Sequence, residues 1–332
     1  MGIRNSLKGF QTPIRRFVWV IIIIFFLYSC RLLPERGGNG DPQSYDPALI
    51  SETFAYGGIT REVLLYVPFP LPKAGVPLVV MLHAEGDTPE SAMRGTTEGR
   101  WNELAFREKF IVVYPEGHNR FWNDCRPNLL NQSSDQDDVG FILAMLEWLG
   151  GSYPIDYSQV FVAGHSNGGM MAMRLALEAP GAVRAVFSNN GPLAADSECS
   201  QPAEALSVMF LAGTDDPIIP YEGGPVGLSG SDLGSVLSAE ETIATFLEIM
   251  AIQAEPQITE IRDRESDDES NVTRFVYEGS GVALWFYRVM GGGHAWPGEA
   301  LFSSLERQTN GTKNRDINAA DEAWDFFMES LK

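Results

Sequence analysis

The sequence predicts an α/β fold with a mostly parallel central sheet and helices on both faces. Short continuous apolar runs such as 78–82 (LVVML) are typical of parallel strands that are buried on both sides. Amphipathic stretches such as 101–109 lie between these runs, which is the alternation typical of βαβ units. At 332 residues, 44% hydrophobic and 20% charged, the chain is long enough for one full-sized core.

The N-terminal segment has the pattern of an export signal. Basic residues up to Arg16 precede an apolar run, 17–28, which is shorter than the roughly 20 residues of a membrane span. Leu27-Tyr28-Ser29-Cys30 resembles a bacterial lipobox, in which the cysteine becomes the lipidated first residue of the mature protein. An uncleaved signal anchor is the alternative, because Tyr28 is bulkier than is usual at that position.

This pattern divides the chain into three parts. We expect a lipoprotein-type signal peptide at 1–29, a flexible tether rich in Gly, Pro and Asp at 30–50, and one folded domain at 51–332. The mature protein would be exported and anchored through lipidated Cys30, facing the periplasm or the extracellular side.

The net charge argues against one class of partner, and the few cysteines bear on the redox state of the protein. The formal net charge is -20, which argues against nucleic acid as a partner and suits a protein kept soluble by self-repulsion. With Cys30 lipidated, Cys125 and Cys199 remain in an oxidising compartment, where they could pair. Two unpaired buried thiols are the alternative. The oligomeric state is left open.

The folded domain is expected to begin with an antiparallel pair of strands around Gly57-Gly58, followed by alternating strands and helices. The acids at 137–138 stand in the first turn of a helix, where capping is a better interpretation than a catalytic dyad because adjacent helical residues do not face each other. The acidic run 262–270 is expected to be a solvated loop. Helices are expected at 101–109, 139–149, 170–177, 239–250 and 317–331, and strands at 78–82, 110–114, 160–162, 185–188, 208–211, 275–277 and 283–289.

The segment Gly164-His165-Ser166-Asn167-Gly168 matches G-x-S-x-G between a strand and a helix, the context of a nucleophile elbow. A serine on such a turn has a strained backbone, and glycines two places either side avoid clashes with neighbouring backbone. The turn directs the N–H of Asn167 and the positive end of the helix at the place where an oxyanion would form. Ser166 is the predicted nucleophile.

A serine nucleophile needs a base, and the base needs an orienting acid. His294 follows the last predicted strand in a glycine-rich loop, whereas the other three histidines precede Ser166 or adjoin it. The order Ser, acid, His on successive strands makes His294 the candidate base. Asp215 or Asp216, after the strand at 208–211, is the candidate acid.

From residue 60 onward the chain resembles a known family. LVVMLH (78–83), DDVGFI (137–142), VFVAGHSNGGMMAMRLA (160–176), GTDDPIIPYEGG (213–224) and GGGHAWPG (291–298) are similar to motifs of the feruloyl esterases, acetyl xylan esterases and polyhydroxybutyrate depolymerase-like esterases, which is carbohydrate esterase family one in the broad sense. The resemblance implies an α/β-hydrolase catalytic domain with a Ser166, Asp216 and His294 triad. Asp216 is chosen because the family's aspartate directly precedes the proline matched here by Pro217.

One departure from the family lies beside the chemistry. The family usually has His-Gly after the first buried parallel strand, whereas here His83 is followed by Ala84. That loop would supply the second oxyanion N–H, from Glu85 or its neighbour Ala84. An alanine forced to positive φ would displace the donor. A non-catalytic ligand-binding lipoprotein on a decayed fold is therefore the alternative function.

The expected activity is hydrolysis of carboxylic esters of the feruloyl, acetyl-sugar or hydroxyalkanoate type through an acyl-enzyme on Ser166. No metal or organic cofactor is implied. Trp122, Asn123 and Trp296 are candidates for lining an acyl or sugar pocket, with plain packing as the alternative for the tryptophans.

Overall fold

The computed structural model describes residues 48–127, 136–197, 199, 204–227, 233–279 and 281–332. Residues Pro47 to Lys332 form one compact unit. The expected signal peptide and Cys30 lie outside the described residues. Within the described ranges, no helix combines the length and the apolar character that crossing a membrane requires.

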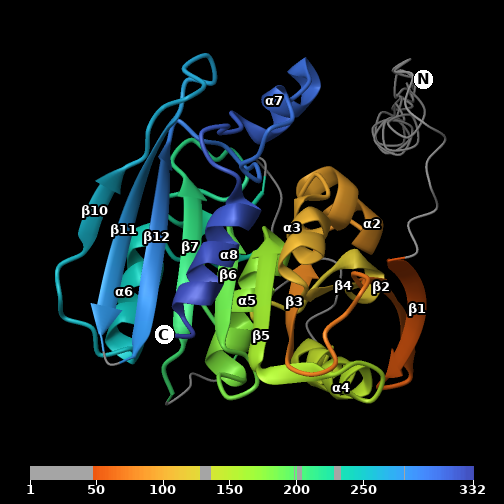
Figure 1. Cartoon of the computed structure of the whole chain (residues 1–332). Helices are drawn as coiled ribbons and strands as arrows, with labels where there is room; N and C mark the ends of the chain where they lie inside the picture. Colours follow the sequence, from red (N-terminus) through yellow and green to blue (C-terminus); the bar gives the residue numbers. More distant parts are fainter. Residues whose placement is uncertain (1–47, 128–135, 198, 200–203, 228–232, 280) are drawn as a thin grey trace, which may run out of the picture. The chain divides into compact units, whose positions relative to one another are not determined.

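A ten-stranded sheet forms the centre of this unit, in the order β1-β2-β4-β3-β5-β6-β7-β12-β11-β10 (Figure 1). Neighbouring strands from β4 across to β12 pair in parallel. The strands outside them, β2 and β1 at one end and β11 and β10 at the other, pair antiparallel. The sheet is therefore mostly parallel, as predicted.

The strands are β1 (Leu49–Tyr56), β2 (Ile59–Tyr66), β3 (Val76–Leu82), β4 (Ile111–Pro115), β5 (Ile155–His165), β6 (Ala185–Asn189), β7 (Ser207–Gly213), β10 (Gln257–Glu260), β11 (Asn271–Gly279) and β12 (Val282–Met290), with a separate small pair, β8 (Gly224–Pro225) and β9 (Ser235–Val236). The helices are α2 (Pro89–Ser91), η1 (Ala92–Thr96), α3 (Arg100–Glu108), η2 (His118–Arg120), α4 (Asp138–Gly150), α5 (Asn167–Glu178), α6 (Ala239–Ile249), α7 (Ser304–Asn310) and α8 (Ala319–Glu329).

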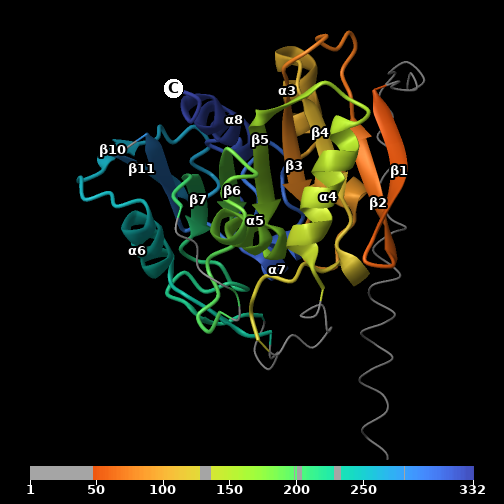
Figure 2. The same ribbon diagram turned by 90° about the horizontal axis from the view of Figure 1, so that it is seen from below.

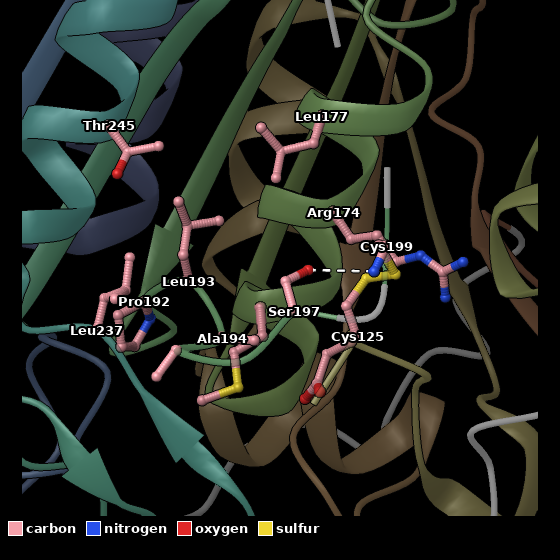
Figure 3. Close-up of a pocket in the computed structure, with 13 residues that line it drawn as sticks. Cys125, Arg174, Leu177, Pro192, Leu193, Ala194, Ser197, Cys199, Leu237 and Thr245 are labelled. Atoms are coloured by element: carbon pink, nitrogen blue, oxygen red, sulfur yellow. Dashed lines mark hydrogen bonds between the residues drawn. A yellow bond between two sulfur atoms is a disulfide. The ribbon is translucent and has the colours of Figure 1, made fainter. Parts of the chain in front are cut away.

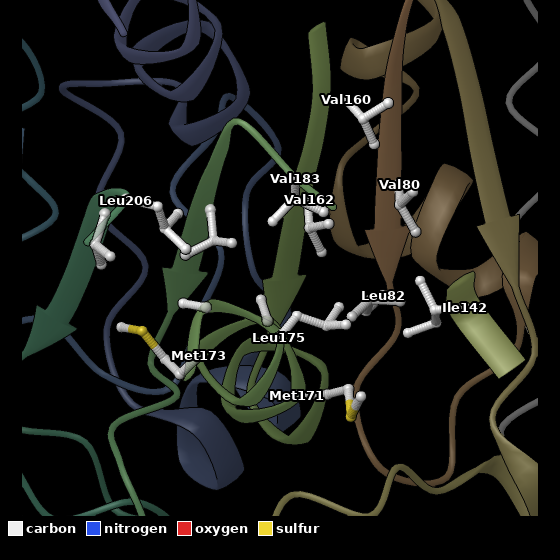
Figure 4. Packing of buried hydrophobic residues seen from close by; sticks show 14 of the residues in the cluster. Val80, Leu82, Ile142, Val160, Val162, Met171, Met173, Leu175, Val183 and Leu206 are labelled. Carbon is white, nitrogen blue, oxygen red and sulfur yellow. The ribbon is translucent and has the colours of Figure 1, made fainter. Parts of the chain in front are cut away.

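Two apolar layers sandwich the sheet. Alternate residues of β3 belong to different layers: Val80 belongs to the apolar cluster that includes side chains of α4, α5 and α6, whereas Val79 belongs to the cluster that includes side chains of α3 and α8. Figure 2 shows α8 and α6 on opposite sides of the sheet. Figure 4 shows the first layer, where Met171 and Leu175 of α5 lie against the strands. Helices cover both faces, which is the predicted α/β architecture.

The predicted elements are present, and their ends differ by a few residues. The strand predicted at 275–277 is longer, because β11 pairs with β12 along its whole length from Asn271 to Gly279. β10 and α7 were not predicted. β10 is exposed at every residue and α7 has no buried residue, so neither has the apolar pattern that signals an element.

The two acids that open α4 have separate structural roles. Asp137 caps the helix by accepting a hydrogen bond from the Gly140 N–H, which confirms the capping interpretation. Asp138 is fully buried and pairs with Arg61 of β2 at 2.6 Å. Burial raises the pKa of the Asp138 carboxyl although Arg61 acts in the opposite direction. The prediction that the acidic run 262–270 is a solvated loop is wrong at Asp268, because this residue is buried and only 4% exposed.

Candidate active site

Ser166 stands on a sharp turn between β5 and α5, with φ 55° and ψ -123°. The glycines of the motif allow this turn. A Cβ on Gly164 would lie 2.1 Å from the carbonyl oxygen of Gly168, and a Cβ on Gly168 would lie 2.4 Å from that of Leu82. Both positions therefore require glycine, as the elbow interpretation predicted, and the strained serine is held at the start of a helix.

Asp216 and His294 form a pair at the ends of β7 and β12. The His294 Nδ1–H donates to Asp216 Oδ2 at 2.7 Å, and both side chains are buried. The other carboxylate oxygen, Oδ1, accepts from the N–H groups of Ile218 and Ile219, each at 2.8 Å. Asp215 is exposed, and among the described residues its carboxylate accepts a hydrogen bond only from the Thr214 hydroxyl. Of the two candidate acids, Asp216 is thus the one placed to orient His294.

His165, the residue before the nucleophile, lies close to the predicted base, His294. Its ring lies 5.0 Å from the His294 ring, centroid to centroid, beside Ser166. Burial and the neighbouring His294 lower the pKa of His165 to about 3, so it is neutral at physiological pH. No hydrogen bond joins the Ser166 hydroxyl to His294 in the described structure. Such bonds are often long in unliganded enzymes and shorten when substrate binds.

The loop after β3 is held by His83. The His83 Nε2 accepts from the Gly117 N–H at 2.8 Å, which leaves Nδ1–H to donate to the Ala84 carbonyl oxygen at 2.7 Å. Burial lowers the pKa of His83 to about 4 and keeps this neutral tautomer. Ala84 is not among the residues with positive φ, whereas Gly86 is. The alanine is therefore accommodated without the strain that the departure from His-Gly suggested.

The candidate oxyanion donors are the N–H groups of Asn167 and Glu85. The Asn167 N–H is at the first position of α5, where helical N–H groups lack an intrahelical partner. Its side chain is fixed: Oδ1 accepts from the Trp122 N–H at 2.8 Å, and Nδ2 donates to the Trp122 carbonyl oxygen at 2.9 Å and to Asp124 Oδ2 at 2.6 Å. The Glu85 carboxyl has a raised pKa because of burial.

Of the three proposed pocket-lining residues, Trp122, Asn123 and Trp296, burial decides the case for the two tryptophans. Trp122 is 0% exposed and Trp296 3% exposed. The Trp122 indole N–H donates to the His83 carbonyl oxygen, and Trp296 packs edge-on against Phe187. The buried Asn123 N–H donates to Asp138. The two tryptophans are core residues, so the packing alternative describes them, and Trp122 supports the loop beside the oxyanion donors.

Cys125 and Cys199 form a disulfide. It lies beside a cavity of about 210 Å³ along α5, where the segment with Leu193, Ala194 and Ser197 runs past Arg174 and Leu177 (Figure 3). The two cysteines and Glu178 are the group close enough to hold a metal ion among the residues that the structure describes. Because the sulfurs are joined to each other, they supply no thiolate ligand.

Sequence reasoning missed Asp124 and the pair Asn189 and Asn190. Asp124 forms a fully buried ion pair with Arg126 and bonds to Asn167. Asn189 is the last residue of β6 and Asn190 follows it, and both lie beside the His294 loop. A polar residue after a buried strand was the signal used for Asp216 and His294, and it would also have found the two asparagines.

The fold and the site define an α/β-hydrolase: a serine elbow at the centre of a mostly parallel sheet, with an Asp–His pair on later loops. A family model described as phospholipase/carboxylesterase matches residues 73–226. The protein is thus a carboxylic ester hydrolase of the serine esterase class.

Named relatives confirm the resemblance to esterases. NocK of Nocardia uniformis subsp. tsuyamanensis, provisionally named an esterase, is 28% identical over 85% of this chain and 83% of its own length. Feruloyl esterase C of Emericella nidulans is 27% identical over 58% of this chain and 67% of its own. The acetyl xylan esterase structure from Aspergillus awamori covers 81% of this chain and 94% of its own, with a TM-score of 0.54 at 17% identity, which supports the fold.

Proposed function

We propose that the protein hydrolyses esters through a triad of Ser166, His294 and Asp216. The observation behind the proposal is the buried Asp216–His294 hydrogen bond next to a serine held in a strained elbow. Asp216 fixes His294 with Nδ1 protonated, so that Nε2 is free to accept the Ser166 proton.

The reaction would proceed in two halves. His294 takes the proton as Ser166 Oγ attacks the ester carbonyl, and then donates it to the departing alcohol. A water molecule, deprotonated by His294, then attacks the carbonyl carbon of the acyl-enzyme; the bond from that carbon to Ser166 Oγ breaks, the acid is released, and His294 returns the proton to Ser166 Oγ. The N–H groups of Asn167 and Glu85 would stabilise the oxyanion in each half, where loss of one donor typically lowers turnover by about 10² to 10³.

Hydrolysis of a short ester with a chromogenic leaving group tests this mechanism. Ser166→Ala and His294→Ala should each reduce kcat by several orders of magnitude, because triad members act as a unit. Ser158→Ala, at an exposed serine, is the matched control and should keep full activity. Turnover that survives Ser166→Ala would refute the triad, and absence of turnover in the folded wild type would favour the non-catalytic alternative.

The substrates we propose are feruloyl, acetyl-sugar or hydroxyalkanoate esters. Relatives named feruloyl esterase and acetylxylan esterase support the first two. The cavity along α5 begins one helical turn from the nucleophile, because Met170, in its wall, donates its N–H to the Ser166 carbonyl oxygen. Measuring kcat/KM for one ester of each kind tests this proposal and ranks the three classes, and an enzyme that turns over a chromogenic ester but none of the three would refute it.

We also propose that the enzyme is exported and lipid-anchored through Cys30. The basic segment, the short apolar run and Leu27-Tyr28-Ser29-Cys30 motivate this. Cys30→Ala should move the protein out of the membrane fraction or leave an unprocessed precursor. An intact mass that retains the residues before Cys30, without an acyl group, would contradict the proposal.

A further inference from the structure

Asn189 and Asn190 lie at the end of β6, between the strand that leads to Ser166 and the strand that leads to Asp216. Their side chains are 0% and 2% exposed. Burying a primary amide is unfavourable unless its donors and acceptor find partners. Among the described residues Asn189 Oδ1 has no hydrogen-bond partner, so what Asn189 contributes comes from the partners of its NH₂ group, whereas Asn190 has partners for both its donor and its acceptor.

Asn189 links the elbow to the His294 loop. Its backbone carbonyl oxygen accepts from the Ser166 N–H at 2.9 Å. Its Nδ2 donates to the Ala295 carbonyl oxygen at 3.1 Å and lies 2.8 Å from His165 Nδ1. Since a carbonyl oxygen only accepts, the Asn189 NH₂ faces both partners and His165 Nδ1 is the acceptor.

Asn190 links the His294 loop to the Asp216 loop. Its Nδ2 donates to the carbonyl oxygens of Gly293 and Ala295, on either side of His294, at 3.2 Å each. Its Oδ1 accepts at 3.0 Å from the N–H of Gly213, the last residue of β7. Asn190 has φ 50°, a conformation that asparagine adopts more readily than most residues.

We propose that Asn189 and Asn190 are a positioning pair, which sets the relative placement of the three loops that present Ser166, Asp216 and His294. The proposal rests on the triad mechanism above. Neither amide contacts the reacting atoms; both donate to backbone carbonyl oxygens of the His294 loop, and Asn189 also donates to the His165 ring. Two other bonds also join the acid and base loops, from the Asp215 N–H to the Gly292 carbonyl oxygen and from the Gly291 N–H to the Thr214 hydroxyl.

Because those bonds remain, loss of one amide should displace the loops rather than unfold them. A misplacement of about 1 Å in a catalytic group lowers the rate by about 10²-fold. We therefore expect kcat to fall by about 10- to 100-fold while KM stays within about threefold, since a positioning defect acts on the chemical step.

The variants separate the amide donors from the backbone conformation. Asn190→Asp keeps the acceptor for the Gly213 N–H and tolerates positive φ, but replaces the donor to the two carbonyl oxygens. Asn190→Gly keeps the backbone freedom and removes both functions. Asn189→Asp tests the bond to Ala295. Asn318→Asp, at the N-cap of α8, is the matched control and should leave kcat unchanged.

Two readouts distinguish positioning from a merely structural role. In an Asp216→Asn background, Asn190→Gly should reduce kcat by less than about threefold, because the Asp–His pair that it positions is already broken. In the protein with Asp216 intact, Asn190→Gly should shift or broaden the low-field proton NMR resonance of the His294 Nδ1–H, which reports the bond to Asp216 without any turnover.

Wild-type kcat in both Asn190 variants, a loss confined to KM, or full additivity with Asp216→Asn would overturn the proposal. If Asn190→Gly fails to fold, Asn190→Asp gives the same comparison with the acceptor retained. The triad mechanism is judged separately: turnover surviving in Ser166→Ala refutes that mechanism, while the proton resonance still tests whether the asparagines position His294.

Discussion

Replacing Asp216 by Asn should nearly abolish turnover, and the hydrogen bonds of the Asp216 carboxylate give the reason. The Asp216 Oδ1 accepts from two backbone N–H groups, those of Ile218 and Ile219. An asparagine must keep its oxygen there, because turning the NH₂ group toward two donors would leave them unsatisfied at about 1–3 kcal/mol each. The NH₂ group therefore faces His294 and donates to Nδ1, which forces the imidazole proton onto Nε2.

A histidine in that tautomer cannot accept the Ser166 proton. Loss of the correct tautomer lowers kcat by about 10⁴ in the serine protease case, which corresponds to about 5.5 kcal/mol of activation free energy. Asp215→Asn is the control: the exposed Asp215 carboxylate accepts a hydrogen bond from the Thr214 hydroxyl and makes none to His294, so kcat should stay within about twofold. Stopped-flow or steady-state hydrolysis of a chromogenic ester measures both. Near-normal kcat in Asp216→Asn, or a severe loss in Asp215→Asn, would refute the assignment.

Three further predictions concern the surroundings of the site. The pKa of His83 falls from its ordinary 6.5 to about 4 on folding, so the stability that neutral His83 contributes is present above pH 6.5 and is lost as the pH falls from 6.5 to 4. Between these pH values, the free energy of unfolding should change with pH by about 1.4 kcal/mol per pH unit more in the wild type than in His83→Gln. Equal slopes for the two proteins in urea titrations would contradict this prediction. Ala84→Gly should leave kcat within about twofold, since Ala84 already has negative φ, and should lower the unfolding free energy by up to about 1 kcal/mol; a faster enzyme would show that the alanine does impair the oxyanion site. Replacing Cys125 and Cys199 together by Ala should lower the unfolding free energy by about 2–4 kcal/mol, because the disulfide closes a loop with a sequence separation of 74; an unchanged urea midpoint would show that the crosslink adds no stability.

The sequence predicts the sheet well because its central strands are short apolar runs, such as β3, and its amphipathic helices lie between them. The Gly57-Gly58 turn predicts an antiparallel pair, and β1 and β2, on either side of that turn, form it. β10 could not be predicted, because it is exposed at every residue and is held in the sheet by its pairing with β11. An edge strand of this kind depends on long-range pairing that the local pattern does not show.

The sequence locates the loops that carry Ser166 and His294 but does not show which buried residues support them. Ser166 and His294 have local patterns, an elbow and a glycine-rich loop. The choice of Asp216 over Asp215 depended on the resemblance to a family, and the structure adds the reason, since Asp216 is buried against His294 and Asp215 is exposed. Whether a tryptophan lines a pocket or fills the core depends on tertiary packing, which is why Trp122 and Trp296 needed the structure.

The short β10 strand at the edge of the sheet also affects how the protein behaves at high concentration. An open edge offers unpaired backbone groups to any other chain that can add a strand. β10 offers a short stretch, Gln257–Glu260, in which the exposed Ile258 is followed two residues later by the charged Glu260. With a formal net charge of -20, two molecules that approach edge to edge also repel each other. The edge is therefore a poor template for strand addition, and association through this sheet should be slow even in concentrated solution.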